Sequence, residues 1–207
     1  SWIEEHNQPF AVISCAGKYR TGKSFLLNRL VDADAGTGFG VGSSVQACTK
    51  GIWVYKEFIK TSSCDVLFVD TEGIDSLDAD NTHDVRIFTL ALLLSSSFVY
   101  NSIGHIDEAA LQTLSVMTRV TQNIKISSDK LPTAAQLSAH MPTFYWILRD
   151  FSLRLESKDG TAMSKAEYME EALNSDTSNE QKCSTREAIR DAFVNRTLIT
   201  LPRPVND

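Results

Sequence analysis

Short apolar runs alternate along the chain with stretches in which apolar residues recur every three or four positions. The short runs are rich in β-branched and aromatic residues, which is typical of strands. They cover residues 8–17, 52–59, 65–73, 97–104, 143–151 and 196–204. Because only residues 60–64 separate the second run from the third, these two runs are predicted to pair as an antiparallel hairpin.

Helices are predicted where apolar residues recur at the spacing of one helix face. The predicted helices cover residues 22–32, 85–96, 106–124, 164–175 and 184–195. The third has the clearest inner face, formed by Ala110, Leu114, Met117 and Ile124. The last two begin at Ser164 and Ser184, whose hydroxyl groups can cap a helix.

The order of these elements indicates the fold. Strands and helices mostly alternate, which favours a mainly parallel sheet with helices on both faces. We therefore predict a three-layer α/β fold with one antiparallel edge strand, and we expect Trp53 and Trp146 to lie in its core. The polar residues 33–51 and 75–84 are predicted loops, and residues 173–184 are a predicted mobile insertion.

Composition and charge limit the class of protein. The 207 residues are enough for one core, and we expect a single domain that covers residues 1–207. Apolar residues make up 43% and charged residues 22%, as in globular proteins in general. The net charge of −6 argues against nucleic acid as the main partner, because binding it needs a basic face. Residues 87–100 form the most apolar stretch, which is too short to cross a bilayer and is predicted to be buried.

The cysteines and the first residue bear on the setting of the protein. The spacings of Cys15, Cys48, Cys64 and Cys183 match neither a zinc motif nor a disulfide framework. Reduced thiols and a cytoplasmic location are therefore expected. Because the chain begins at Ser1 and not at methionine, we expect it to be part of a longer protein; no signal peptide is visible.

A phosphate-binding motif lies between the first predicted strand and the first predicted helix. Gly17 to Ser24 read G-K-Y-R-T-G-K-S and fit G-x-x-x-x-G-K-[ST] at every fixed position. The glycines let backbone N–H groups approach phosphate oxygens, Lys23 supplies positive charge, and Ser24 offers a hydroxyl to Mg²⁺. The helix adds its positive N-terminal end. The residues expected to contact the nucleotide here are Gly17, Lys18, Tyr19, Arg20, Thr21, Gly22, Lys23, Ser24 and Phe25.

Two later segments complete the predicted nucleotide site. Asp70 ends an apolar strand, and Gly73 follows it. In proteins with this phosphate loop, an aspartate at such a strand end helps to hold Mg²⁺, and the glycine N–H meets the γ-phosphate. Thr49 lies in the polar loop between the first helix and the hairpin, from which it can reach both groups. Ser24, Thr49 and Asp70 are therefore the predicted Mg²⁺ ligands.

The base is not identified by the usual motif. An N/T-K-x-D sequence, which reads guanine in most GTPases, is absent, so adenine and guanine both remain open. Arg149 and Asp150 end an apolar strand, at the sheet edge where ligands bind in α/β folds. Asp150 can accept the N1–H and N2 protons of guanine, a donor pair that adenine lacks. The alternative for these two residues is a salt bridge at the strand end.

Five segments together resemble one family. They are residues 17–30, 41–54, 66–73, 93–104 and 144–153. In this order they resemble the large GTPase domain of the guanylate-binding proteins, in the dynamin superfamily, over nearly the whole chain. The resemblance implies that Arg149 and Asp150 read guanine, that GTP is hydrolysed to GDP and in some members to GMP, and that two domains pair across their nucleotide faces. A helical stalk follows this domain in the family, so we expect an isolated GTPase domain whose membrane association would need regions outside this chain.

Hydrolysis needs an oriented water molecule and neutralisation of the developing charge. Ile74 stands where Ras-type GTPases place a glutamine after D-x-x-G, and its side chain can do neither. Arg20, inside the phosphate loop, is predicted to act as an arginine finger in cis, a role that the resemblance also implies. Lys23 and Thr49 are predicted to assist catalysis, and Glu72 to help order the water.

Two positions depart from the family. Ala47 stands where many vertebrate members have a serine that helps to position water, and Cys48 replaces a frequent histidine. These departures leave the rate of hydrolysis and the step to GMP open. Two alternatives therefore stand beside a GTP-hydrolysing domain: a GTP-bound scaffold with slow turnover, and a P-loop ATPase or kinase. His83, His105 and His140 lie in predicted loops without metal-ligand partners.

Overall fold

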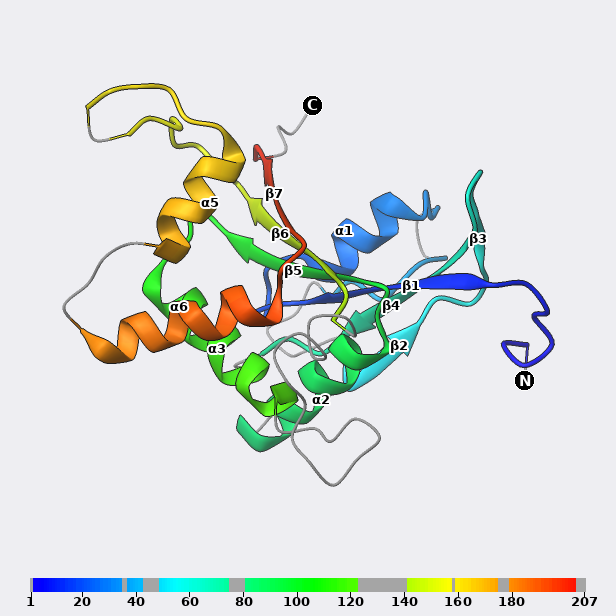
Figure 1. Cartoon of the computed structure of the whole chain (residues 1–207). Helices are drawn as coiled ribbons and strands as arrows, with labels where there is room; N and C mark the ends of the chain where they lie inside the picture. Colours follow the sequence, from blue (N-terminus) through cyan, green and yellow to red (C-terminus); the bar gives the residue numbers. More distant parts are fainter. Residues whose placement is uncertain are drawn as a thin grey trace.

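A seven-stranded sheet forms the middle of the molecule (Figure 1). The computed structural model describes residues 2–34, 37–42, 49–74, 81–122, 141–157, 159–174 and 179–203. Its strands are β1 (Phe10–Ala16), β2 (Ile52–Val54), β3 (Ile59–Lys60), β4 (Asp65–Thr71), β5 (Ser97–Ile103), β6 (Thr143–Arg149) and β7 (Arg196–Leu201). Its helices are α1 (Lys23–Leu30), α2 (Asn81–Leu94), α3 (Glu108–Gln122), α5 (Lys165–Asn174) and α6 (Glu180–Ala192).

The sheet is parallel except at one edge. Its strand order is β2-β4-β1-β5-β6-β7, and β2 and β3 both pair with β4 in the antiparallel sense. Ile52 lies opposite Thr71 and Ile59 opposite Val66, so β2 and β3 are two parts of one edge strand. The predicted hairpin is confirmed, but the exposed Lys56 and Glu57 bend the edge strand and divide it in two.

Side chains alternate between the two faces of the sheet and fill two cores. Phe98 and Tyr100 of β5 lie in one core, whereas Val99 between them lies in the other. Helix α1 covers the second core through Leu26 and Leu27, and α2, α3, α5 and α6 cover the first. Figure 1 shows α1 on one side of the sheet and α2, α3 and α6 on the other. The predicted three-layer α/β fold with an antiparallel edge is confirmed.

The helix starts show which capping signals operate. Ser164 caps α5 as predicted: its hydroxyl accepts from the backbone N–H of Glu167 at 3.2 Å, and the Glu167 carboxylate accepts from the backbone N–H of Ser164 at 2.6 Å. The predicted start of α6 at Ser184 is wrong. Asn179 caps this helix, because its side-chain oxygen accepts from Gln181 N at 3.0 Å and from Lys182 N at 3.2 Å.

Other predicted boundaries also shift. Helix α2 begins at Asn81, so residues 81–84 are helical and not loop; residues 75–80 lie outside the described residues. Residues 180–184 of the predicted insertion belong to α6, and residues 175–178 lie outside the description.

Burial confirms some of the predicted core. Ala110 and Leu114 of α3 are buried, whereas the side chain of Met117 and the whole of Ile124 lie outside the described part. Trp146 is fully buried in β6 and donates its indole N–H to the Ser102 hydroxyl at 2.9 Å. Trp53 is 49% exposed, so its predicted place in the core is wrong, because β2 lies at the edge of the sheet.

The apolar stretch at residues 87–100 is only partly buried. Leu90, Leu93 and Leu94 of α2 face solvent, while Phe88 and Leu92 of the same helix pack in the core. Among the helices of the described ranges, none has both the length and the apolar character needed to cross a bilayer.

Candidate functional site

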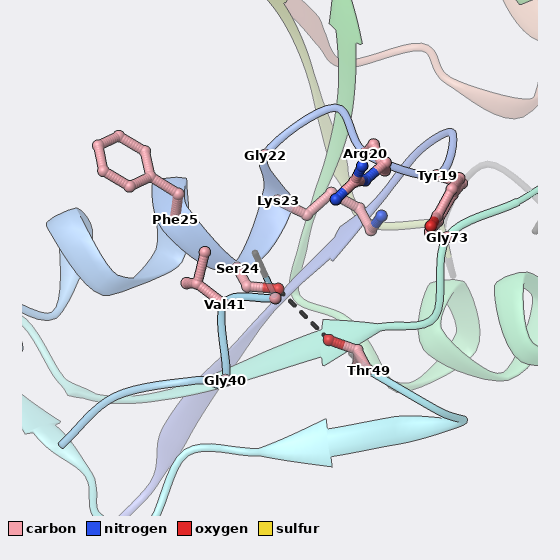
Figure 2. Close-up of a pocket in the computed structure, with 11 residues that line it drawn as sticks. Tyr19, Arg20, Gly22, Lys23, Ser24, Phe25, Gly40, Val41, Thr49 and Gly73 are labelled. Atoms are coloured by element: carbon pink, nitrogen blue, oxygen red, sulfur yellow. Dashed lines mark hydrogen bonds between the residues drawn. The ribbon is translucent and has the colours of Figure 1, made fainter. Parts of the chain in front are cut away.

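A cavity of about 320 Å³ lies over the loop that joins β1 to α1. It is lined by Tyr19, Arg20, Gly22, Lys23, Ser24, Phe25, Gly40, Val41, Gly42, Thr49 and Gly73 (Figure 2). Its walls thus come from the predicted phosphate loop, from the Thr49 loop and from Gly73. Gly40, Val41 and Gly42 were not predicted as site residues, although the glycine-rich segment that holds them follows α1 and is typical of a loop that covers a ligand.

Backbone hydrogen bonds hold the phosphate loop against the segment after β4. The N–H of Tyr19 donates to the carbonyl of Ile74 at 2.8 Å, and the N–H of Ile74 donates to the carbonyl of Gly17 at 3.1 Å. Gly73 leaves room for this approach, since a Cβ there would lie 2.5 Å from the Cα of Tyr19. The loop that carries Gly73 is therefore fixed directly beside the phosphate loop.

Three predicted contacts of the phosphate loop are not among the described residues that line the cavity: Gly17, Lys18 and Thr21. Thr21 is buried, and its hydroxyl donates to the Lys18 carbonyl at 2.8 Å. That bond keeps the turn of the loop closed. These residues shape the phosphate loop from within.

Lys23 opens α1 at the floor of the cavity. Its ammonium group is buried and donates to the Lys18 carbonyl at 3.2 Å. Burial lowers the pKa of Lys23, while the nearby Cys15 thiol and the carboxyl groups of Asp70 and Glu72 act in the opposite direction. Burial takes the ammonium group away from water, and a phosphate anion in the cavity would stabilise its positive charge.

Ser24, Thr49 and Asp70 converge, as the Mg²⁺ prediction requires. The Ser24 hydroxyl donates to Asp70 Oδ2 at 2.6 Å, and the Thr49 hydroxyl donates to the same oxygen at 3.2 Å. The two hydroxyl oxygens lie 3.4 Å apart, the contact drawn as a dashed line in Figure 2.

Asp70 is the buried member of this group. It is 0% exposed, and burial raises its pKa although the Ser24 hydrogen bond and the Lys23 charge act to lower it. Its Oδ1 has no hydrogen-bond partner among the described residues. An all-oxygen donor set with one unsatisfied buried carboxylate oxygen fits Mg²⁺, which prefers such ligands.

Arg20 stands at the rim of the cavity. It is exposed, and its backbone has a left-handed φ of 60°, which is uncommon outside glycine. Its guanidinium carbon lies 5.7 Å from the centre of the Tyr19 ring. Figure 2 shows Arg20 and Lys23 projecting from the same loop beside the cavity. The predicted finger is thus near the cavity and exposed.

Glu72 does not line the cavity with the other described residues but joins two of its walls. Its carboxylate accepts from the backbone N–H of Gly51 at 2.8 Å, and its own N–H donates to the Gly51 carbonyl at 2.8 Å. The same carboxylate oxygen, Oε2, lies 3.2 Å from His83 Nε2. The prediction that His83 lies in a loop is wrong, because it lies in α2, where it contacts Glu72.

His105 lies outside this cavity, and three other residues discussed in the sequence lie outside the described part of the chain. His105 lines a separate cavity of about 140 Å³ on the other side of the phosphate loop, with Lys18 and Asp107 among its walls. His140, Ala47 and Cys48 lie outside the described residues.

Arg149 reaches the phosphate loop from the end of β6. Its Nη1 donates to the Gly22 carbonyl at 3.0 Å, and its guanidinium carbon lies 5.3 Å from the centre of the Phe25 ring. Gly22 has a φ of 78°, and a Cβ there would collide with the Arg149 guanidinium. Asp150 follows in a left-handed conformation with a φ of 55°. Neither Arg149 nor Asp150 is among the described residues that line the cavity, although the end of β6 lies beside it.

Ile74 occupies the position that carries a glutamine in Ras-type GTPases. Its side chain is only 4% exposed and packs in the core with residues such as Phe88 and Tyr100. Ile74 is accordingly not among the described residues that line the cavity.

Comparison with known proteins gives the family. The model of the guanylate-binding protein N-terminal domain matches residues 1–207. The chain belongs to the guanylate-binding protein family. It is 40% identical to guanylate-binding protein 2 of Rattus norvegicus over 96% of the chain, and 39% identical to guanylate-binding protein 1 of Homo sapiens over 96%. Guanylate-binding protein 4 of Homo sapiens is 37% identical over 99%.

Membership of this family confirms the predicted resemblance to the guanylate-binding proteins. The chain spans about a third of the length of these relatives, 35% of the first two and 33% of the third.

Proposed function

We propose that this domain binds GTP together with Mg²⁺ in the cavity over the phosphate loop and hydrolyses the γ-phosphate. The observation that carries the proposal is the convergence of Ser24, Thr49 and Asp70 within 3.4 Å of one another. Ser24 and Thr49 line the cavity together with the buried Lys23, whereas Asp70 is not among the described lining residues and reaches the cavity through the two hydroxyl groups. The sequence motifs give only the order of these residues along the chain. Phosphoryl transfer needs their side chains close together in space, as they are here.

Each group has a distinct task in holding the substrate. The N–H groups at the start of α1 and the ammonium of Lys23 bind phosphate oxygens. Ser24, Thr49 and Asp70 would hold Mg²⁺, which when bound would neutralise charge on the β- and γ-phosphates. Because Thr49 and Gly73 line the cavity from separate loops, both loops would contact the γ-phosphate.

Arg20 supplies positive charge for the transition state. Its exposed guanidinium starts from within the phosphate loop, so a change of rotamer brings it over the β/γ bridge without a rearrangement of the backbone. An arginine finger contributes roughly 10³ to 10⁵ in rate where it has been measured. The attacking water is oriented by the segments of Thr49 and Glu72, since the side chain of Ile74 is buried.

The preference for guanine resides at the end of β6. The Asp150 carboxylate accepts the N1–H and N2 protons of guanine, while Arg149 fastens this end of the strand to Gly22. Adenine offers no matching donor pair, so it would leave the carboxylate without its hydrogen bonds.

Two copies of the domain pair through their nucleotide faces, and pairing stimulates hydrolysis. The support for this part is the family resemblance and the exposure of Arg20 at the rim, where a second copy can order it. The net charge of −6 argues against nucleic acid as the main partner. We also propose a cytoplasmic location for the domain.

Titration calorimetry with Mg²⁺ and either GTP or ATP tests the nucleotide. We expect clearly tighter binding of GTP, and tighter binding of ATP would contradict the proposal. Removal of Mg²⁺ with EDTA should weaken GTP binding and stop turnover.

Light scattering of the domain with GDP and with a non-hydrolysable GTP analogue tests pairing. We expect dimers with the analogue, and a monomer with both nucleotides would contradict pairing.

A GTP-bound scaffold with slow turnover is the second candidate. It is favoured by the burial of Ile74, which leaves the usual water-positioning place without a polar side chain. Single-turnover hydrolysis separates the two: a scaffold would bind GTP tightly and leave it intact during the assay, even at protein concentrations that permit pairing.

A further inference from the structure

Glu72 clamps together the two segments that carry Thr49 and Asp70. Glu72 and Gly51 exchange two hydrogen bonds of 2.8 Å, one through the Glu72 carboxylate and one through its backbone N–H. Gly51 lies two residues after Thr49, and Glu72 lies two residues after Asp70. If the Glu72–Gly51 hydrogen bonds were lost, the Thr49 segment could move relative to Asp70, and the 3.2 Å distance between the Thr49 hydroxyl and Asp70 Oδ2 would change.

His83 fixes the outer end of this clamp. Its Nε2 lies 3.2 Å from Glu72 Oε2, the same oxygen that accepts from Gly51. The two side chains differ in exposure: 46% for His83 and 7% for Glu72. The imidazole thus stands between the buried carboxylate and solvent, and with a proton on Nε2 it donates a hydrogen bond to the carboxylate.

We propose that His83 is a positioning residue, which orients Glu72 and through it the Thr49 segment for hydrolysis. The proposal rests on the proposed GTPase function of the cavity. Helix α2 makes this physically reasonable, because it runs for 14 residues and packs Phe88 and Leu92 into the core. His83 is thereby anchored to a rigid element, while the segment that it steadies lies in a loop.

A purely structural role for His83 predicts a different outcome. If His83 only anchored the start of α2, its loss would lower the stability of the domain and would not depend on Glu72. If it acts through Glu72, its loss changes the rate of hydrolysis, and this effect disappears once Glu72 is gone.

The test uses the full chain with His83→Ala, His83→Gln and Glu72→Ala, and the double variant of His83→Ala with Glu72→Ala. Thr82→Ala, a neighbouring exposed position on α2, is the matched control. Single-turnover hydrolysis at saturating GTP should fall roughly 10- to 100-fold in His83→Ala, as for other residues that orient a catalytic group. GTP affinity should change less than about 3-fold, since transition-state interactions are the ones lost. The amide donor of His83→Gln should restore most of the rate, and Thr82→Ala should keep it.

The double variant and a second readout make the result decisive. His83→Ala should add no further loss in the Glu72→Ala background, and it should speed hydrogen exchange at the Gly51 amide in the wild-type background. A His83→Ala variant with the full rate, additive losses in the double variant, or unchanged exchange at Gly51 would each overturn the positioning role. A wild-type chain that does not hydrolyse GTP would instead contradict the proposed function, and the Gly51 exchange would still report on the clamp.

Discussion

The guanidinium of Arg149 donates a hydrogen bond to the carbonyl of Gly22 at 3.0 Å, and so ties the end of β6 to the phosphate loop. The two residues are 127 positions apart in the chain. The same guanidinium lies over the ring of Phe25, in the first turn of α1. Arg149, the residue before Asp150, is therefore part of the support of the phosphate loop, and the end of β6 is tied to that loop.

Arg149→Ala should weaken GTP and ATP alike. The variant removes a charge-assisted hydrogen bond to the loop that both nucleotides share, which is expected to cost on the order of 10- to 100-fold in affinity. Titration calorimetry with the two nucleotides measures the effect, and Arg154→Ala, an exposed arginine near β6, is the control. A loss confined to GTP would show that Arg149 reads the base and does not support the loop.

Asp150→Asn should weaken GTP far more than ATP. The amide cannot accept both guanine protons without bringing its own N–H₂ against one of them, so we expect roughly a 10²-fold loss for GTP. The exposed Asp191 of α6 supplies the control, Asp191→Asn. Equal losses for GTP and ATP in Asp150→Asn would rule out base reading by this carboxylate.

Arg20→Ala should lower turnover far more than affinity. The exposed guanidinium makes its main contribution when charge develops in the transition state, so single-turnover hydrolysis should fall about 10³-fold or more, with a small change in GTP affinity. Arg86→Ala, an exposed arginine on α2, controls for the lost charge. An unchanged single-turnover rate in Arg20→Ala would remove the arginine finger from the mechanism.

Ile74→Gln should not create a faster GTPase. The side chain at this position is 4% exposed and packs in the core, so the new amide would be buried away from the cavity. We expect a loss of roughly 1–3 kcal/mol in the free energy of unfolding and no gain in turnover. Urea titration measures this loss. In the same titration Leu90→Gln, at an exposed position of α2, should change the free energy of unfolding very little. A gain in rate would place residue 74 beside the attacking water.

Cys15 should resist alkylation in the native domain. It is 0% exposed, and burial together with the Asp70 charge raises the pKa of its thiol well above the usual range. The thiol therefore stays protonated and out of reach at pH 8, whereas Cys64 and Cys183 are partly exposed. Mass spectrometry after iodoacetamide treatment should find Cys15 modified only once the protein is unfolded. Modification of native Cys15 at the rate of Cys183 would contradict this burial.

Much of the fold could be predicted because its signals are local. The apolar runs that form β4, β5 and β6 are mostly buried on both faces, as is the end of β1, and such strands stand out from their glycine-rich and polar flanks. The phosphate loop is contiguous in sequence, so its residues could be named in advance. The start of α6 was predicted wrongly at Ser184. Asn179, which caps the helix, is an equally good capping residue and was also present in the sequence.

The remaining features depend on contacts between distant segments. Nothing near Trp53 in the sequence distinguishes an edge strand from a central one, and only the strand order exposes its side chain. The contacts of Arg149 with Gly22 and of His83 with Glu72 arise from the way the strand ends and α2 meet. Such pairings leave no periodic or composition signal in a single sequence. The contact of His83 with Glu72 therefore could not be predicted from the sequence.

The most direct test of the account is the rate at which the purified chain converts GTP and ATP in the presence of Mg²⁺, with the products separated by chromatography. We predict that GTP is converted to GDP, and that any GMP follows from the same site, while ATP is left essentially intact. This result would support two roles together: Mg²⁺ binding by Ser24, Thr49 and Asp70, and guanine recognition at the strand end that carries Arg149 and Asp150. Consumption of ATP at a rate equal to or above that of GTP, or bound GTP that is never cleaved, would contradict it.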